Sequence, residues 1–295
     1  MIIGIPKGLL YYDYYPFFES FFQGLGAHTL RSEDTNKNIL DEGVKHCVDE
    51  ACLPVKVFHG HVASLKDQCD LILIPRIMQI NQKEYICPKF CGLPEMVKNS
   101  IEDLPGLIDQ PIYASSKKKL FTWAREAGSM LGADRRLIEN SFTKALDVQA
   151  RHNPGIRDEK YRITIALGGH PYNIYDSFVN MNIVAKLNAM DVGVITEEYI
   201  GEEIKSQELR SLYKRPFWTF ARNSYGFLSY IARERRVDGI IYISSFACGI
   251  DSVVIELVKE RVANMPFMVL KLDEHTGEAG LDTRIEAFVD MIWRR

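Results

Sequence analysis

The chain has 295 residues, 46% of them hydrophobic and 25% charged, which is the composition of a globular protein long enough to build a core without disulfide bonds. Its net charge of −3 gives no positive field for nucleic acid or anionic lipid, so we expect neither as a partner. No stretch approaches the roughly 20 apolar residues that span a bilayer, and the N-terminus lacks the pattern of a signal peptide, so we expect a cytoplasmic protein.

The first part of the chain alternates strand and helix patterns. Residues 2–5 predict a strand, residues 16–25 a helix and residues 27–30 a second strand. Residues 71–75, Leu-Ile-Leu-Ile-Pro, are too short and too apolar for anything but a buried strand. We expect an α/β domain with a parallel sheet, and we place it at residues 1–112.

The middle of the chain, residues 116–152, has no strand pattern, and apolar residues recur there at helical spacing. A break at residues 132–134 divides this segment into two predicted helices, and the Asn-Pro-Gly sequence at 153–155 ends it with turn residues. We assign residues 113–160 to a helical connector.

The last part, residues 161–295, repeats the alternation of the first and predicts a second α/β domain. The patterns predict strands at 162–167, 192–196, 239–244 and 267–272, and helices at 176–190, 217–236, 251–262 and 282–293. We therefore expect two similar halves of the Rossmann-like or flavodoxin-like class, each with a parallel sheet that helices cover.

Three of the six cysteines stand at comparable places in this scheme. Cys52 and Cys248 lie at predicted helix starts, and Cys87 lies in a loop beyond the strand at 71–75. A helix start favours the thiolate, which is the form that binds metal. Since open α/β sheets bind ligands at the carboxyl ends of their strands, we expect these three thiols to meet in a cleft between the halves. The alternative is that each is a small buried hydrophobic side chain.

The other cysteines leave the number of ligands open. Cys47 and Cys91 lie near Cys52 and Cys87, and either could be a further ligand. Cys47 falls at the predicted end of a helix, where the dipole opposes a thiolate, so Cys91 is the preferred fourth ligand. Cys69, just before a core strand, is interpreted as structural. The cysteine spacing is not that of a structural zinc site, so an iron–sulfur cluster fits these thiols better.

Polar residues offer further candidates for catalysis. His170 and His275 each follow a predicted strand, and each could transfer protons, bond to a cluster ligand or simply stabilise its turn. Glu278 could serve as a general acid or base, although an acidic residue is also common at a helix start. His59 and His61 are spaced by two, which excludes a metal pair on one helix face and favours ordinary core or surface positions.

Several segments along nearly the whole chain form a combined pattern that is more specific than any one of them. They are Gly4–Leu10, Tyr14–Pro16, Cys52–His61, Tyr85–Pro88, Gly92–Pro94, Gly168–Asn173, Phe217–Thr219, Ser245–Asp251, Asp273–Gly280 and Thr283–Phe288. Together they resemble the 2-hydroxyacyl-CoA dehydratase and benzoyl-CoA reductase superfamily, and most closely its poorly characterised branch related to the acyl-CoA dehydratase activases.

The resemblance implies a cofactor, a partner and a substrate class. In the dehydratases of that superfamily, three cysteines of one chain hold a 4Fe–4S cluster between α/β domains and leave one iron open, and the matching positions here are Cys52, Cys87 and Cys248. An open iron can act as a Lewis acid as well as pass electrons. An ATP-dependent activase-type iron–sulfur protein is the implied electron donor, and a CoA thioester or another small molecule is the implied substrate.

Departures from the family pattern keep alternatives open. The chain has no P-loop sequence, so we do not expect it to be the ATPase itself. Cys91 and Cys47 allow a fourth thiolate or the double-cubane cluster of other superfamily members, although Cys69 is poorly placed for the latter. The alternatives to a reductase or dehydratase are an electron carrier or accessory protein without a substrate, and a metal-free binding module. A second copy of the chain, in a homodimer, is a further candidate partner.

Overall fold

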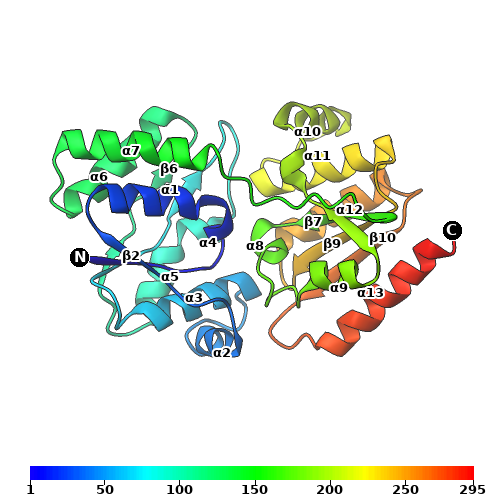
Figure 1. The fold of residues 1–295 in the computed structure, drawn as a ribbon, viewed down its shortest axis with the longest axis horizontal. Coiled ribbons are helices and arrows are strands. Elements are labelled where there is room, and N and C mark those ends of the chain that lie inside the picture. Colours follow the sequence, from blue (N-terminus) through cyan, green and yellow to red (C-terminus); the bar gives the residue numbers. More distant parts are fainter. The chain divides into compact units, whose positions relative to one another are not determined.

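The computed structural model describes all residues from 1 to 295 and divides the chain into unit 1, Met1–Asn153, and unit 2, Pro154–Arg295 (Figure 1). Strands pair in parallel throughout the sheets of both units, with helices between them. The predicted class, two α/β halves with parallel sheets, is confirmed. The division falls at the Asn-Pro-Gly turn, so the helices of the predicted connector belong to unit 1.

The sheet of unit 1 has four short strands. They are β1 (Ile2–Ile5), β2 (His28–Arg31), β3 (Leu71–Leu73) and β5 (Gly106–Ile108), and two further strands, β4 (Ile77–Gln79) and β6 (Ile112–Tyr113), form a small sheet of their own. The order β2-β1-β3-β5 places the first strand inside the sheet, with the second strand on one side of it and the third strand on the other. The last two strands of this unit gave no recognisable pattern because they have only two or three residues.

The helices of unit 1 surround an aromatic core. They are α1 (Tyr11–Gly24), α2 (Lys37–Lys45), α3 (Leu53–Leu65), α4 (Pro88–Cys91), α5 (Leu93–Ser100), α6 (Lys117–Met130) and α7 (Arg135–Gln149). Trp123 of α6 is almost fully buried, and its ring lies 5.4–6.3 Å from four phenylalanine rings of α1. The predicted break between α6 and α7 is confirmed, since Asp134 caps α7 by accepting from the backbone N–H of Leu137.

One boundary in unit 1 differs clearly from its prediction. Helix α1 begins at Tyr11, five residues before the predicted start at Pro16. Proline is best tolerated in the first turn of a helix, which favoured a start at this residue. The rings of Tyr11 and Tyr15 stack at 4.9 Å, and this packing accompanies a helix that continues on both sides of the proline.

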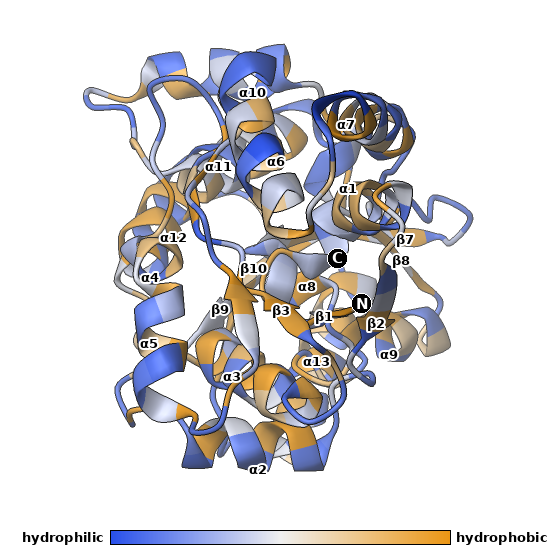
Figure 2. Cartoon of the chain, turned by 90° about the vertical axis from the view of Figure 1, so that its left-hand side faces the viewer, coloured by the Kyte–Doolittle hydropathy of each residue, from blue (hydrophilic) through white to orange (hydrophobic).

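The sheet of unit 2 has the same order as that of unit 1. Its strands are β7 (Ile163–Gly169), β8 (Val192–Ile195), β9 (Gly239–Ser245) and β10 (Phe267–Leu272). Their order, β10-β9-β7-β8, again places the second strand beside the first on one side and the third strand on the other. Every residue of β9 is buried. The hydropathy colouring of the chain is shown in Figure 2.

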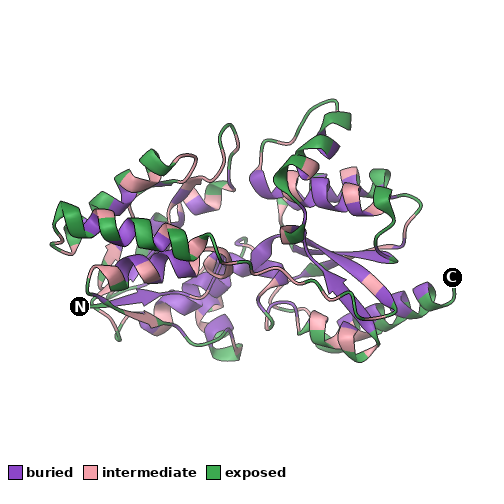
Figure 3. Cartoon of the chain, turned by 45° about the horizontal axis from the view of Figure 1, so that its top comes forward, coloured by how far each residue is buried: buried purple, intermediate pink, exposed green.

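Helices cover both faces of this sheet, with α11 and α12 on one face and α9 and α13 on the other (Figure 1). The helix that ends near the C-terminus, α13, shows both buried and exposed residues, as expected of a surface helix (Figure 3). The helical segments are α8 (Pro171–Ile174), α9 (Ile183–Ala189), η1 (Glu197–Tyr199), α10 (Glu202–Glu208), η2 (Leu209–Ser211), α11 (Thr219–Glu234), α12 (Gly249–Arg261) and α13 (Glu278–Trp293).

The predicted helix at 176–190 is wrong in its first half. The side chain of Asp176 accepts hydrogen bonds from the backbone N–H groups of Phe178 and Val179, which forms a turn in place of helix. Asn182, with φ of 57°, then precedes α9. No helix of either unit has the length and hydropathy that crossing a bilayer requires.

Candidate functional site

The carboxyl ends of β7 and β9 form the topological switch point of the unit 2 sheet. The connection after β7 leads toward β8 on one side, and the connection after β9 leads toward β10 on the other. Ligands of doubly wound α/β proteins bind at this kind of position, because the two departing loops leave room between them. His170 directly follows β7, and Cys248 lies three residues beyond β9.

The end of β7 has a backbone that suits only glycine. Gly169 has φ of +135°, and a Cβ atom at this position would lie 2.2 Å from the carbonyl oxygen of Ile243 in β9. The two strands can therefore approach this closely just before the site because no side chain is present. His170 follows as the N-cap residue of α8.

The turn after β9 is also conformationally unusual. Ala247 has φ of +61°, a left-handed conformation that costs a residue with a Cβ atom on the order of 1–3 kcal/mol. Cys248 is the next residue and the N-cap of α12, and Asp251 lies in the first turn of that helix. The strained turn thus places a thiol and a carboxylate at one helix start.

His170, Cys248 and Asp251 form a group that we call the His–Cys–Asp group. A ring nitrogen, the sulfur and a carboxylate oxygen lie within 4.8 Å of one another. The side chains of His170 and Asp251 are only 3% and 1% exposed, and His170 Nδ1 lies 3.2 Å from Asp251 Oδ2. These are the donor types that bind transition metals such as zinc.

Tyr242 of β9 contacts the carboxylate of this group. Its hydroxyl donates a hydrogen bond of 2.8 Å to Asp251 Oδ1. Burial acts to raise the pKa of Asp251, but His170 and the hydrogen bonds from Tyr242 and Ser244 outweigh it and hold that pKa below its usual value. Burial and the nearby carboxylate raise the pKa of Tyr242 well above its usual value. The pair therefore consists of a protonated phenol and an ionised carboxylate.

Aromatic contacts fix the ring of His170. It stacks on Tyr172, with ring centroids 5.1 Å apart and planes inclined by 6°, and it meets the edge of Phe220 at 5.3 Å. Tyr172 belongs to α8, and Phe220 lies in the first turn of α11. These two ring contacts restrict the orientation of the imidazole.

Two buried polar atoms at this site have no hydrogen-bond partner. They are Asp251 Oδ2 and Asn173 Nδ2, although Asn173 Oδ1 accepts from the hydroxyl of Ser245 at 3.0 Å. A buried polar atom without a partner costs about 1–3 kcal/mol, so such atoms are rare in folded proteins. Of these two atoms, Asp251 Oδ2 belongs to a residue of the His–Cys–Asp group.

In unit 1, two cysteines occupy positions like that of Cys248. Cys52 is the N-cap of α3, and Cys87 is the N-cap of the short helix α4. The predicted helix starts at Cys52 and Cys248 are confirmed. The prediction of a loop around Cys87 missed α4, which begins at Pro88 and has only four residues.

The remaining thiols have different surroundings. Cys91 ends α4, four residues after Cys87. Burial raises the pKa of Cys47 and of Cys69, so both favour the thiol form, and Cys69 Sγ donates to the carbonyl of Leu65 at 3.1 Å. This contact agrees with the structural role predicted for Cys69. No disulfide bond joins any of the six cysteines.

The histidines of α3 are buried core residues. His61 lies between the hydroxyls of Ser32 and Thr35, each 2.9 Å from a ring nitrogen. Burial, with the nearby positive charge of Lys7, lowers the pKa of His61 to about 3. His59 Nδ1 donates to the carbonyl of Val55 at 2.8 Å. Neither histidine is arranged as a metal ligand.

The two other predicted catalytic residues lie elsewhere in unit 2. The side chain of His275 is 86% exposed and stands in a turn that Asp273 and Thr276 stabilise. Glu278 begins α13, and its carboxylate accepts from Lys186 Nζ at 2.7 Å. Of the three predicted catalytic residues, the structure brings only His170 to Cys248.

Sequence reasoning did not identify Asp251, Tyr242 or Asn173 as site residues. A usable signal existed for Tyr242, because its hydroxyl interrupts the apolar strand Gly-Ile-Ile-Tyr-Ile and must find a partner when buried. Asp251 was read only as the beginning of a helix. The partner of each became visible only when β7, β9 and α12 were placed together.

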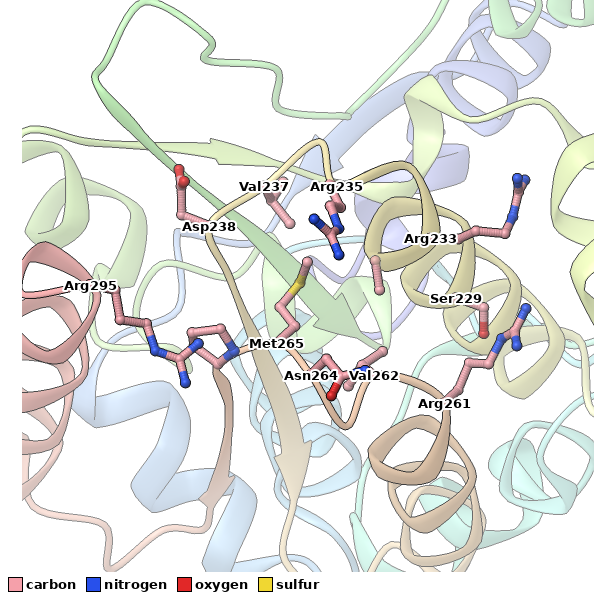
Figure 4. A pocket seen from close by; sticks show the side chains of 12 residues that line it. Ser229, Arg233, Arg235, Val237, Asp238, Arg261, Val262, Asn264, Met265 and Arg295 are labelled. Atoms are coloured by element: carbon pink, nitrogen blue, oxygen red, sulfur yellow. The ribbon is translucent and has the colours of Figure 1, made fainter.

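A pocket of about 660 Å³ lies at the opposite, amino edge of the same sheet (Figure 4). Arginines line it, among them Arg233, Arg235 and Arg261 from the ends of α11 and α12. Arg233 and Arg261 bond to Glu208, and cations are generally favourable at helix C-termini. These contacts account for Arg233 and Arg261, and none of the predicted site residues lines this pocket.

Fold and site together define a protein of two doubly wound α/β units with a thiol-bearing site at a sheet switch point. Two family models match it, the CoA enzyme activase uncharacterised domain over residues 2–200 and the 2-hydroxyglutaryl-CoA dehydratase, D-component, over residues 117–292. Each covers more than half of the chain, which therefore belongs to the 2-hydroxyglutaryl-CoA dehydratase D-component family and has an activase-related domain. The resemblance inferred from the sequence is confirmed. No curated protein shows a significant match to the chain.

Proposed function

We propose that the chain holds a 4Fe–4S cluster through Cys52, Cys87 and Cys248 and accepts low-potential electrons from an ATP-dependent, activase-type iron–sulfur protein. With one iron open, it reduces or activates a small substrate, for which a CoA thioester is the class that the family name indicates. The observation that carries this proposal is the shared position of the three cysteines, each of which is the N-cap residue of a helix.

The donor chemistry of these residues fits such a cluster. Iron–sulfur clusters are held by Cys thiolates, and Cys52 and Cys248 lie where α3 and α12, each 13 residues long, present free backbone N–H groups that can donate to an anion. Burial raises the pKa of Cys47 and of Cys69, which disfavours the thiolate at these two positions. The three N-cap cysteines are therefore preferred to Cys47 and Cys69 as ligands.

The bound cluster would supply one-electron transfer and, at an iron without a cysteine ligand, Lewis acidity. His170 is the protein group beside Cys248 that can carry a proton, and Tyr172 and Phe220 hold its ring in place. We assign to His170 the transfer of protons or hydrogen bonding at this site. His275 and Glu278 stay sequence-based predictions.

A second candidate is an electron carrier or accessory protein without its own substrate. Cys91 favours this second candidate, because it ends α4 only four residues after Cys87, the N-cap residue of the same helix. A fourth thiolate from Cys91 would leave no open iron. A double-cubane cluster would need still more of the thiols, including the two whose pKa burial raises.

The test is reconstitution of the whole chain with iron and sulfide without oxygen. We expect a brown protein with about four irons per chain, and we expect iron to fall to background in Cys52→Ser, Cys87→Ser and Cys248→Ser. Cys69→Ser is the matched control and retains the cluster. Iron content that none of the three substitutions changes would contradict the proposal.

Cys91→Ser separates the two candidates. A retained cluster whose electron paramagnetic resonance spectrum changes when a small ligand is added indicates an open iron and supports the first. Loss of the cluster indicates a fourth thiolate and supports the second. Reduction of the cluster by an activase-type protein in the presence of ATP tests the partner.

Two further parts of the proposal concern the state of the protein. We place it in the cytoplasm, where a reducing environment keeps cysteines as thiols. A homodimer is the proposed assembly, and sedimentation of the reconstituted protein measures it.

A further inference from the structure

His170 and Asp251 are in close buried contact. Nδ1 and Oδ2 are 3.2 Å apart, but this contact does not give Oδ2 a well-aligned hydrogen bond. Two donor atoms arranged in this way can both face a third point. Ligands of a tetrahedral metal stand roughly 3–4 Å apart, given metal–ligand bonds of about 2.0–2.3 Å.

Cys248 supplies the third donor of this arrangement. Its sulfur lies within 4.8 Å of the ring nitrogen and of the carboxylate oxygen. The other carboxylate oxygen, Asp251 Oδ1, accepts from Tyr242, which orients the group and leaves Oδ2 for one further bond. The strained residue Ala247 and the glycine before His170 fix the two loops that carry the donors.

We propose that unit 2 by itself binds one divalent transition-metal ion through Cys248, His170 and Asp251 whenever no cluster is present. Sulfur, nitrogen and oxygen donors together suit zinc or cobalt, whereas magnesium and calcium prefer oxygen alone. Three protein donors leave one position of a tetrahedral ion open. The inference does not depend on the cluster, because all three donors belong to unit 2.

Unit 1 contains a useful comparison. Cys47 Sγ lies 3.9 Å from His59 Nδ1, so a thiol and an imidazole are neighbours there as well. His59 Nδ1, however, already donates to the carbonyl of Val55, and burial raises the pKa of Cys47. This pair therefore serves as a matched control that should not bind the ion.

The ion and the cluster would compete, since both require Cys248. A protein loaded with zinc should assemble its cluster more slowly than the metal-free protein, and a chelator should restore the rate. The His–Cys–Asp group would thus influence when the cluster can form.

The experiment is an anaerobic titration of the full, cluster-free chain with cobalt(II). We expect one ion per chain, with a thiolate-to-cobalt charge-transfer band and the intense visible bands of tetrahedral cobalt. Cys248→Ser should abolish the charge-transfer band, and His170→Gln and Asp251→Asn should weaken binding by at least about tenfold. Tyr242→Phe, which removes only the supporting hydrogen bond, should weaken it by about 10- to 100-fold.

The controls are Cys47→Ser and the double substitution Cys52→Ser with Cys87→Ser, all of which should leave cobalt binding unchanged. Loss of the charge-transfer band in the double variant, or its persistence in Cys248→Ser, overturns the inference. Thermal unfolding of each variant verifies that it folds, and the double variant tests the proposal with the His–Cys–Asp group intact. A chain that assembles a cluster but binds no cobalt disproves this inference alone, whereas cobalt binding without cluster assembly disproves the proposed function alone.

Discussion

Unit 1 and unit 2 have the same parallel strand order, but their buried histidines have different partners. In unit 1, the ring nitrogens of His61 meet two hydroxyls, and Lys56 Nζ donates to the carbonyl of Asp49 at 2.9 Å. In unit 2, His170 Nδ1 instead lies 3.2 Å from Asp251 Oδ2 and close to the thiol of Cys248. One topology therefore supports two kinds of histidine environment, and that of His170 combines the donor types that bind transition metals.

The cysteines are distributed unevenly between the two units. Five of the six belong to unit 1 and only Cys248 to unit 2, where the polar group surrounds it. Unit 1 thus offers alternatives for a thiol ligand, while unit 2 offers a single thiol with a histidine and a carboxylate. The chemistry of the site should be more sensitive to substitutions in unit 2.

The largest expected effect tests whether the two units are stabilised separately. Trp123→Ala removes the ring at the centre of the unit 1 core and should lower its free energy of unfolding by about 3–5 kcal/mol. Phe227→Ala, at a fully buried position of unit 2, is the counterpart and should have a similar cost there. Hydrogen exchange measured by mass spectrometry should show lost protection only in the substituted unit. Equal loss in both units would mean that they unfold together.

The second effect tests the close approach of strands that unit 2 has at its site. Gly169→Ala should lower the melting temperature, because the added Cβ meets the carbonyl of Ile243 in addition to the strain of a positive φ. Gly132→Ala in unit 1 is the control, since its φ is +72° but no atom lies within 4 Å of the added Cβ. Its cost should be limited to about 1–2 kcal/mol of backbone strain. Equal costs at both positions would show that the strand contact is unimportant.

The third effect is the loss of unit 1 stability at low pH. The pKa of His61 is about 3 in the folded chain and near 6.5 when the chain is unfolded, because the folded state buries the neutral ring. Its contribution to stability is present above pH 6.5 and is lost as the pH falls toward 3. His61→Gln should reduce the dependence of the free energy of unfolding on pH between about 6.5 and 3. Urea unfolding at a series of pH values measures this dependence. An unchanged slope would exclude His61 as its source.

The smallest effect is a loss of unit 2 stability as the pH rises, which is opposite in direction to the effect of His61. Burial raises the pKa of Glu197 to about 8 although Lys205 opposes it, so the folded chain holds this carboxyl protonated at neutral pH. The resulting stability is present below about pH 4.5 and is lost as the pH rises toward 8. Glu197→Gln should remove this loss on the alkaline side, as the same urea experiments can measure. A slope that persists in the variant would assign it to another group.

Local signals predicted much of the fold and part of the site. Proline at the second position after Cys52 and apolar periodicity beyond it marked the start of α3, and the buried strands were recognisable because their apolar runs are short. Helix α4 and strands β5 and β6 were missed because two to four residues contain too little pattern. The turn at Asp176 was missed because its side chain competes with the helix through bonds to nearby backbone N–H groups.

The sequence by itself determined the class of the fold, the family and the candidate thiols, because these follow from periodicity and from residue types that act over a few positions. Only the tertiary structure decided that Asp251, Tyr242 and His170 meet at Cys248. These residues come from β9, from α12 and from the loop after β7, and they are brought together by the parallel pairing of β7 with β9. Strand pairing depends on contacts between distant parts of the chain, so no local pattern could reveal which polar groups would share one buried site.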